Sequence, residues 1–555
     1  MKEMIEVLCK NNHTRTKYKF GTNLIEIIKS QNISLKYPIL GAKVNNELKE
    51  LYYRIYSPKT IEFIDITNVD GMRLYIRSLS FILQKAVYDL FPKTNLKIEH
   101  SVSKGLFCEI QGLNTELTSQ IISDIKNRMK EIVNDDIAFK RKKILTTDAI
   151  KSFEKNRFFS KSKLFKIKSD LYSPVHFLGK QINCFYGNFV PSTGYIKVFG
   201  LAKYYNGMLL RIPKTDNPEI LDDIVMQDKM FEIFQEHKHW AKILGIETIG
   251  DLNEVILNGK TGNIIKVSEA LHEKKLAQIA DKIYDKKDKI KLILISGPSS
   301  SGKTTFSKRL AIQLQVAGLK PVMISLDDYF LNRKDTPKDK NGEYNFETIE
   351  AIDIKLFNKN ITDLLDGKEI NLTKFSFEQG HRLYTKNKLK INDTGIIIVE
   401  GIHALNPNLT KTINIKYKFK IYISALTQIS IDSHNRISTT DNRLIRRIVR
   451  DYSYRNYSVV ETLGRWESVK QGENKNIFPF QEQADVMFNS ALLYELGVLK
   501  KYAEPLLRKI PENRPEYSEA TRLIKFLSYF LPISDKEIPP TSILREFLGG
   551  SSFIY

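Results

Sequence analysis

The stretch GPSSSGKT, residues 297–304, constrains the fold of this 555-residue chain more than any other part of the sequence. It follows a short apolar run, residues 291–296, of the kind that forms a buried strand. After it, apolar residues recur at helical spacing through residues 304–318, and a glycine stands where the helix should end. A strand, the pattern GxxxxGK[ST] and a helix in this order predict a phosphate-binding loop.

The residue types of this loop suit a nucleoside triphosphate. Glycines let the backbone curl so that N–H groups point at phosphate oxygens, and the helix N-terminus adds positive partial charge. We expect Lys303 to reach the β- and γ-phosphates and the Thr304 hydroxyl to ligate Mg²⁺. The pattern alone does not separate a kinase from a GTPase or an ATPase motor. The residues expected to bind the nucleotide are Gly297, Ser299, Ser300, Ser301, Gly302, Lys303, Thr304 and Thr305.

Two later apolar runs end in carboxylates, and parallel sheets bind ligands at the carboxyl ends of their strands. Residues 319–326 are followed by Asp327 and Asp328. A carboxylate there can orient an acceptor hydroxyl and take its proton, and the alternative is a pair of acids that caps the strand. The run 395–400 ends in Glu400, which either lies near Mg²⁺ or caps a helix. Three strands in this order predict a doubly wound parallel sheet.

Arginines gather about one predicted helix near residues 441–458. Some of them lie three or four residues apart and therefore share a helical face. Because like charges on one face repel each other, we expect an anionic group to compensate them. Guanidinium forks suit phosphate, and such a helix could close over ATP and stabilise charge on the transferring group. The alternative is a solvated basic face. These residues are Arg443, Arg446, Arg447, Arg450 and Arg455.

The segments GPSSSGKT, LDDYF, IIIVEGIHAL and RLIRRIVRD, in this order and spacing, resemble the uridine kinase/phosphoribulokinase family over about residues 289–489. The resemblance implies an α/β P-loop kinase that transfers the γ-phosphoryl of ATP to a hydroxyl, with Mg²⁺ held by Thr304 and Glu400. It makes Asp327 the base and adds Lys303, Arg447 and Arg450 to catalysis. The residues that it places at the acceptor are Asp327, Glu347, Phe375, Arg382 and Arg455.

The stretch FSFEQGHR, residues 375–382, departs from the pattern YDFxxHxR of uridine–cytidine kinases. Phe375 stands in the Tyr position and Gly380 in the His position, while His381 is one place off. An aromatic platform survives, but hydrogen-bonding groups that could discriminate between bases are lost. The leading hypothesis is phosphorylation of a nucleoside 5′-hydroxyl. The alternatives are a kinase of another hydroxyl metabolite, such as a sugar phosphate, and a tRNA-binding regulatory ATPase.

The first half of the chain carries two further resemblances. The motif AKVNNELKEL resembles the TGS domain, a small ubiquitin-like module of threonyl-tRNA synthetases. Residues 71–92 and 184–201 resemble the second accessory domain of threonyl- and alanyl-tRNA synthetases, an α+β domain that edits mischarged tRNA. That domain uses HxxxH and CxxxH, which are zinc-ligand types. The corresponding positions here hold Arg77, Phe81, Phe185 and Phe189, so we expect a degenerate site without editing activity.

Bulk properties restrict the remaining function classes. The net charge of +22 suits an anionic ligand, but the lysines are spread along the chain, as in a protein from an AT-rich genome. Three distant cysteines exclude a disulfide framework, and no apolar run reaches the ~18 residues of a membrane span. We expect a cytoplasmic homo-oligomer, with tRNA binding by the N-terminal half as an open alternative. The predicted domains are 1–66 (TGS-like), 67–215 (accessory-like), 216–285 (helical linker), 286–495 (P-loop kinase-like) and 496–555 (helical extension).

Overall fold

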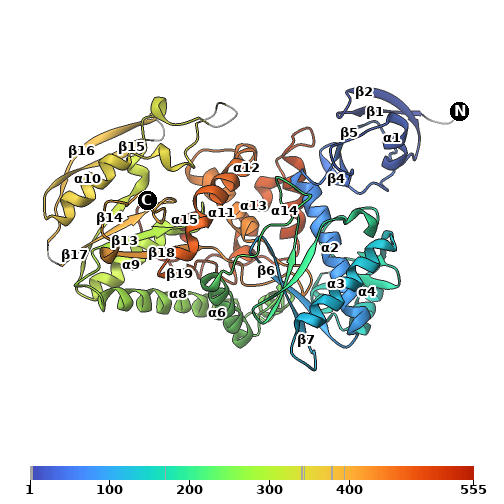
Figure 1. Ribbon diagram of the computed structural model, residues 1–555, viewed down its shortest axis with the longest axis horizontal. Coiled ribbons are helices and arrows are strands. Elements are labelled where there is room, and N and C mark those ends of the chain that lie inside the picture. Colours follow the sequence, from blue (N-terminus) through green and yellow to red (C-terminus); the bar gives the residue numbers. More distant parts are fainter. Residues whose placement is uncertain (1–3, 169, 339–341, 343, 377–378, 393) are drawn as a thin grey trace.

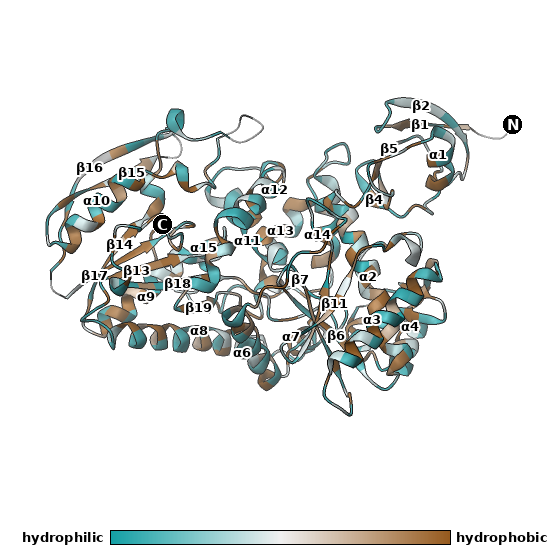
Figure 2. Cartoon of the chain, in the orientation of Figure 1, coloured by the Kyte–Doolittle hydropathy of each residue, from teal (hydrophilic) through white to brown (hydrophobic). Residues whose placement is uncertain are grey.

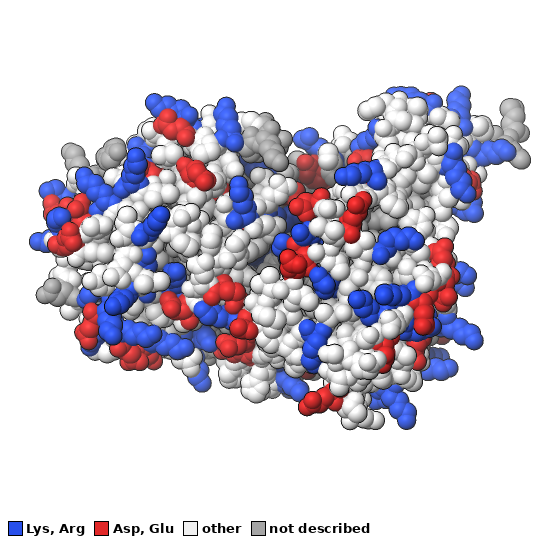
Figure 3. All heavy atoms as spheres, viewed as in Figure 1, with Lys and Arg blue, Asp and Glu red and all other residues white. Residues whose placement is uncertain are grey.

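The computed structural model describes residues 4–168, 170–338, 342, 344–376, 379–392 and 394–555. In the view of Figure 1 the elements up to residue 211 lie mainly on the right and the P-loop domain lies on the left, with α6 and α8 below it. On the face seen in Figure 3, Lys and Arg are spread over the whole molecule and interspersed with Asp and Glu. Within the described residues, no helix combines the length and the apolar character that crossing a membrane requires.

The N-terminal module is a small mixed sheet packed on one helix. Its strand order is β2-β1-β5-β3-β4, with β1 and β5 parallel. Leu24 and Ile27 of the helix are fully buried against the sheet. This is the ubiquitin-like arrangement that the TGS resemblance implies. Its elements are β1 (Met4–Cys9), β2 (Thr14–Lys19), α1 (Leu24–Gln31), β3 (Gly41–Val44), β4 (Glu47–Lys49) and β5 (Lys59–Ile64).

The second module has a long central helix, α2 (Val69–Leu90), whose apolar side is buried against two antiparallel sheets. The sheets have the orders β11-β12-β7-β6 and β10-β9-β8. This α+β arrangement agrees with the accessory-domain resemblance. Its further elements are β6 (Asn95–Val102), β7 (Gly105–Gln111), α3 (Ser119–Asn134), β8 (Phe139–Leu145), α4 (Thr146–Lys155), α5 (Phe159–Ile167), β9 (Tyr172–Leu178), β10 (Gln181–Asn183), β11 (Gly200–Tyr204) and β12 (Gly207–Arg211).

The expected helical linker is helical only from residue 228 onward, in α6 (Asp228–Leu244), α7 (Ile249–Leu257) and α8 (Thr261–Tyr284). Before α6 the backbone N–H groups donate to partners outside any helix. Lys214 N–H donates to the Ile220 carbonyl at 3.0 Å, and Val225 N–H donates to Ser103 Oγ at 2.7 Å. The sequence prediction of helix over 216–227 is therefore wrong, because tertiary hydrogen bonds hold this segment along the β6–β7 hairpin.

The P-loop domain contains a five-stranded parallel sheet in the order β14-β17-β13-β18-β19, which confirms the doubly wound prediction. Its strands are largely brown in Figure 2, as expected for a sheet covered on both faces. Successive residues of β13 enter different cores: Ile293 and Ile295 pack with α8 and α9, and Leu292 and Leu294 pack with α10. The elements are β13 (Leu292–Ser296), α9 (Lys303–Val316), β14 (Lys320–Ser325), α10 (Ile354–Leu365), β17 (Gly395–Glu400), β18 (Lys418–Ser424) and β19 (Val486–Asn489).

The remaining elements surround the carboxyl edge of this sheet. Helices α11 to α14 lie between the two halves in Figure 1, and the chain then returns through α15 toward the P-loop. These elements are the hairpin β15 (Ile370–Ser376) and β16 (His381–Leu389), α11 (Thr439–Tyr454), α12 (Val459–Asn476), α13 (Glu495–Leu507), α14 (Tyr517–Leu527) and α15 (Arg545–Leu548).

The loop between β18 and α11 joins the two halves. Asp432 on this loop forms a buried ion pair with Lys161 of α5. Ile98 N–H of β6 donates to the Ser433 carbonyl at 2.9 Å. The arginine-bearing helix α11 is therefore connected directly to a loop that the N-terminal half holds in place.

Candidate phosphate-transfer site

The phosphate loop joins β13 to α9 in a conformation that its glycines permit. A Cβ on Gly297 would lie 2.0 Å from the Ile423 carbonyl oxygen, so only glycine fits there. Gly302 precedes α9 with φ +83°, in the left-handed region that glycine adopts without a steric cost. Ser300 also has a positive φ of 59°, which is unusual for a residue with a side chain. The loop is thus held in a strained, curled shape.

Three consecutive carbonyl groups of the loop accept hydrogen bonds from surrounding elements. These bonds fix the loop from the side of α11 and from the end of β19, so its curled shape does not depend on a ligand. The three donors are Arg443 Nη1 to the Ser299 oxygen at 3.0 Å, Arg446 Nη1 to the Ser300 oxygen at 3.4 Å and Ser490 Oγ to the Ser301 oxygen at 2.5 Å.

Lys303 and Thr304, the first residues of α9, lie at the carboxyl ends of the central strands. Lys303 Nζ donates to the Pro298 carbonyl oxygen across the loop at 3.2 Å. Thr304 Oγ1 donates to Glu400 Oε1 at 3.3 Å, and Ser325 Oγ donates to the same oxygen at 3.4 Å. The structure therefore brings together the hydroxyl and the carboxylate that the sequence predicts as Mg²⁺ ligands.

Glu400 lies in a region of concentrated negative charge. Burial raises the pKa of Glu400 to about 7, although nearby Lys303 favours the ionised form. The carboxylates of Asp327 and Glu546 raise the pKa further. A divalent cation or a cationic side chain would relieve this repulsion.

The two adjacent aspartates after β14 differ in their contacts. Asp328 Oδ1 accepts a hydrogen bond from Phe375 N–H at 3.2 Å and so anchors the β15–β16 hairpin. The carboxylate of Asp327 accepts no hydrogen bond from any described residue and is exposed to solvent. Desolvation by the surrounding protein nevertheless raises the pKa of Asp327, against the opposing effect of Lys303. Of the pair, Asp327 is thus available to a ligand.

Two of the five arginines are internal ion-pair partners. Arg443 and Glu473 are both buried, with Nη1–Oε1 at 2.5 Å and Nη2–Oε2 at 2.7 Å. Arg446 pairs with Glu495 at 2.5 Å, and both of these side chains are also buried. The anionic groups that we expected to compensate these two arginines are therefore carboxylates of the protein itself.

The other three arginines converge on Asp451. Arg447 Nε and Arg450 Nε donate to its two carboxylate oxygens at 3.0 and 2.9 Å, and Arg455 lies 3.8 Å away and is half exposed. Arg447 Nη1 also donates to Ser299 Oγ of the phosphate loop at 3.0 Å. Arg450 and Arg455 both lower the pKa of Asp327, so they lie on its side of the site.

Glu347 packs against α12. A Cβ on Gly472 of α12 would lie 2.4 Å from the Cβ of Glu347, so glycine allows this close approach. Burial raises the pKa of Glu347 to about 7, and neighbouring Glu473 adds to the rise while Arg447 opposes it. The structure thus brings Glu347 into the same electrostatic neighbourhood as Lys303 and Asp327.

Phe375 and Arg382 of the β15–β16 hairpin make extensive contacts within the protein. Phe375 is 6% exposed, and its ring packs edge-on against Phe330 at 5.8 Å. Arg382 donates to Asp353 Oδ2 at 3.1 Å and to the Phe330 carbonyl at 3.0 Å. Residues 377–378 of the same stretch lie outside the described residues. In this structure both side chains hold the hairpin against the loop that follows Asp328.

The four positions that correspond to editing-site ligands converge in the second module. The rings of Phe81, Phe185 and Phe189 have centroids 5.0 to 5.8 Å apart. Arg77 Nη1 donates to the Asn188 carbonyl at 2.6 Å. Across the described parts of the chain, no cluster of three or more His, Cys, Asp or Glu side chains could hold a metal ion. Hydrophobic packing occupies the place of the ligands.

Sequence reasoning missed the acidic residues that contact the loop and its arginines. Asp451 lies inside the quoted motif RIVRD and could have been found by its spacing of four residues from Arg447. Glu473, Glu495 and Glu546 are distant in sequence, and no local pattern marks them. Glu546 accepts hydrogen bonds from both the N–H and the hydroxyl of Thr305.

Comparisons with known proteins find relatives of the C-terminal half of the chain. Residues 292–493 match the model of the Phosphoribulokinase / Uridine kinase family. A uridine kinase of Ligilactobacillus salivarius is 30% identical over 205 residues, which cover 37% of this chain and 86% of that protein. A solved structure described as a possible uridine kinase from Bacillus stearothermophilus is 16% identical and covers 36% of this chain and 89% of its own, with a TM-score of 0.25.

The N-terminal half is similar to another class of protein. A threonine–tRNA ligase of Desulforamulus reducens is 26% identical over 254 residues, or 44% of this chain and 39% of the ligase. The chain thus spans about two fifths of that ligase's length. The uridine kinase, in contrast, is matched over 86% of its length. The family model covers residues 292–493, which carry the phosphate loop, the acids and the arginine helix. Through this C-terminal half, the chain belongs to the phosphoribulokinase/uridine kinase family.

Proposed function

We propose that this protein is an ATP-dependent kinase that transfers the γ-phosphoryl group to a hydroxyl of a small acceptor, with a nucleoside 5′-hydroxyl as the leading candidate. The observation that carries the proposal is the Asp327 carboxylate, which lacks a hydrogen-bond donor among the described residues and lies near Lys303 of the phosphate loop. A base next to the phosphate end of a nucleotide site is what phosphoryl transfer to a hydroxyl requires.

The chain also offers a site for the Mg²⁺ that accompanies ATP. Mg²⁺ prefers oxygen ligands, and it commonly takes one or two from protein and the rest from phosphates and water. The Thr304 hydroxyl and the Glu400 carboxylate, 3.3 Å apart, fit this requirement. Bound there, the ion would neutralise charge on the phosphate oxygens. Lys303 supplies a second positive charge at the same end of the nucleotide.

In the proposed reaction, Asp327 accepts the proton of the acceptor hydroxyl as its oxygen bonds to the γ-phosphorus. The bond between this phosphorus and the β,γ-bridging oxygen breaks, and ADP leaves. Arg450 and Arg455 lie near Asp327, and Arg447 contacts the phosphate loop through Ser299. Guanidinium groups in these places can stabilise charge on the transferring group.

We assign Glu347 to the binding of the acceptor. Its carboxyl lies within the electrostatic influence of Asp327 and Arg447. A carboxylate there can accept hydrogen bonds from sugar hydroxyls. Phe375 and Arg382 would shape the acceptor pocket through the hairpin that they hold. A kinase of another hydroxyl metabolite, such as a sugar phosphate, is the alternative within the same mechanism.

A coupled assay of ADP release tests the proposal. The panel of acceptors is uridine, cytidine, purine nucleosides, ribose and sugar phosphates, each with ATP and Mg²⁺. Turnover with a pyrimidine nucleoside supports the leading candidate, and turnover only with another acceptor keeps the mechanism and replaces the substrate. Absence of ADP release with every acceptor contradicts the proposal.

Binding of tRNA by the N-terminal half, a homo-oligomeric state and a cytoplasmic location stay predictions. The similarity of residues in this half to threonine–tRNA ligases supports the first of them. Retention of tRNA by the full chain, decreasing steeply with salt, would favour the alternative of a tRNA-binding regulatory ATPase. Light scattering of the full chain measures the oligomeric state.

A further inference from the structure

Residues 542–555, here called the C-terminal segment, follow α14 and return to the start of α9, next to the phosphate loop. The C mark in Figure 1 lies beside α15 and the parallel sheet. Glu546 Oε2 accepts hydrogen bonds from Thr305 N–H at 3.1 Å and from Thr305 Oγ1 at 2.6 Å. The Tyr555 hydroxyl lies 2.8 Å from the same Thr305 oxygen. Both polar groups of Thr305 are thus occupied by the C-terminal segment.

Thr305 is the third residue of α9, and its N–H group belongs to the first helical turn. The N–H groups of a first turn have no acceptor inside the helix, and the helix dipole adds positive potential there. Such groups bind phosphate where a glycine-rich loop leads into a helix. The carboxylate of Glu546 therefore sits where a phosphate group of a bound nucleotide would receive hydrogen bonds.

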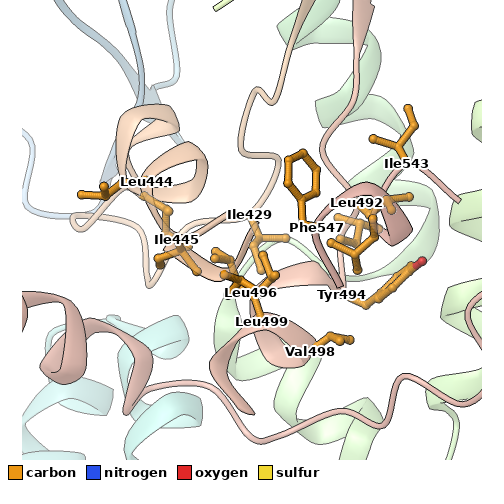
Figure 4. Close-up of a cluster of buried hydrophobic side chains, with 14 of the residues drawn as sticks. Ile429, Leu444, Ile445, Leu492, Tyr494, Leu496, Val498, Leu499, Ile543 and Phe547 are labelled. Carbon is orange, nitrogen blue, oxygen red and sulfur yellow. The ribbon is translucent and has the colours of Figure 1, made fainter. Parts of the chain in front are cut away.

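The position of Glu546 is fixed by the packing of its neighbours. Ile543 and Phe547 are fully buried, and Figure 4 shows them close to Leu492 and Tyr494. A methyl group of Ile543 would lie 2.4 Å from a Cβ on Gly302 of the phosphate loop. Helix α15 is thus a firmly packed element that carries Glu546 to the loop, and the side chain of Glu546 alone can turn away without unfolding it.

We propose that Glu546 is an internal anion that competes with a phosphate group of the nucleotide for Thr305, so that nucleotide binding must release the Thr305–Glu546 contact. The inference rests on the proposed binding of ATP. Glu546 carries the same sign of charge as phosphate and lies within the electrostatic influence of Lys303. The Thr305–Glu546 contact lowers the affinity of the resting protein for nucleotide. The hydrogen bond between Tyr555 and the Thr305 hydroxyl occupies the same side chain and adds to this effect.

Calorimetric titration of the full chain with ATP and Mg²⁺ tests the inference in four proteins: wild type, Glu546→Gln, Glu546→Ala and the control Glu537→Gln. Glu537 belongs to the same C-terminal region, is exposed and makes no contact with the phosphate loop. We expect about tenfold tighter binding in Glu546→Gln, a larger gain in Glu546→Ala and no change in the control, because hydrogen bonds to a charged acceptor are among the stronger ones. Thermal unfolding verifies that each variant is folded.

The outcomes separate the inference from the proposed function. Binding by the wild type without a gain in either Glu546 variant overturns the inference alone. Weaker binding in both Glu546 variants also overturns it, because Glu546 would then contact the nucleotide favourably. Absence of binding in all four folded proteins overturns both the inference and the ATP-dependent function.

Discussion

Arg443 and Glu473 form a buried, two-bond ion pair between α11 and α12, and Glu473 also accepts a hydrogen bond from the Ser299 N–H of the phosphate loop at 3.0 Å. One carboxylate therefore joins the arginine helix, the following helix and the loop. The pair is structural: it sets the distance between α11 and the loop, and it leaves the remaining arginines of α11 to face the site.

Replacing Glu473 with Ala should destabilise the P-loop domain strongly. The change leaves Arg443 buried without a counter-ion, and breaking a buried pair in this way costs about 3–5 kcal/mol. The midpoint of urea unfolding measures the loss. The control is Glu467→Gln on the same helix; Glu467 is exposed and pairs with Lys470 near the surface, so the change should shift the midpoint little. Equal midpoints for the two variants would contradict the structural role of the pair.

Replacing Asp451 with Asn should reduce kcat while leaving the protein folded. Asp451 orients both Arg447 and Arg450, so its loss leaves these guanidinium groups free to leave the site. We expect kcat to fall by about 10- to 100-fold, which corresponds to ~1.4–2.7 kcal/mol of lost transition-state stabilisation. Steady-state kinetics measures this, with Asp485→Asn as a control at the far end of β19. An unchanged kcat in the Asp451→Asn variant would show that Arg447 and Arg450 do not need Asp451 to orient them.

The contribution of Glu400 to the stability of the apo protein should decrease as the pH rises from about 5 to 8. Burial raises the pKa of Glu400 to about 7 from an ordinary value of 4.5, so in this window the folded protein holds a proton that the unfolded chain has released. Stability from this group is complete at low pH and is lost as the pH passes through 7, by on the order of 1–3 kcal/mol. Unfolding midpoints at several pH values measure the slope.

The variant Glu400→Gln isolates this contribution, since its side chain cannot ionise. Between pH 5 and 8 the wild type should lose stability relative to this variant, whatever the slope that the two proteins share. Parallel curves for the two proteins would show that Glu400 titrates in its ordinary range. The affinity of the wild type for ATP and Mg²⁺ should have the opposite pH dependence. Because Mg²⁺ requires the ionised carboxylate of Glu400, this affinity should rise as the pH passes through 7.

The full chain should not deacylate mischarged tRNA, with or without added zinc. Phe81, Phe185 and Phe189 pack against one another where metal-ligand side chains would be needed, and ring carbons cannot bind a metal ion. Release of serine from mischarged threonine tRNA measures the activity. A rate above that of the buffer, abolished by a chelator, would contradict the expectation.

Much of the P-loop domain could be predicted because its signals are local. The loop, the acid after β14 and the acid at the end of β17 each follow a continuous apolar strand, and parallel strands bring their carboxyl ends together. The sequence pattern also indicated that the arginines of α11 need anions. It could not identify Glu473 or Glu495, because these partners are set by helix packing over distances of 30 and 49 residues.

Other features depend on tertiary contacts that carry no sequence pattern. Residues 216–227 are polar and periodic enough to suggest a helix, yet hydrogen bonds to the β6–β7 hairpin hold them in another conformation. The internal partners of Arg382, Asp353 and two backbone carbonyls, could not be predicted from the sequence, and its contact with the acceptor stays a prediction. The contact of Glu546 with Thr305 joins residues 241 positions apart and was not predicted.

The central claim, that Asp327 is the base of a kinase, is tested most directly by comparing turnover and ATP binding in Asp327→Asn. The substitution keeps the size of the side chain and removes its ability to take a proton. ADP release with the preferred acceptor should fall by at least about 100-fold, the usual contribution of a general base, while calorimetric ATP affinity stays within a few-fold of the wild type. Near-normal turnover with normal ATP binding would contradict the assignment of Asp327.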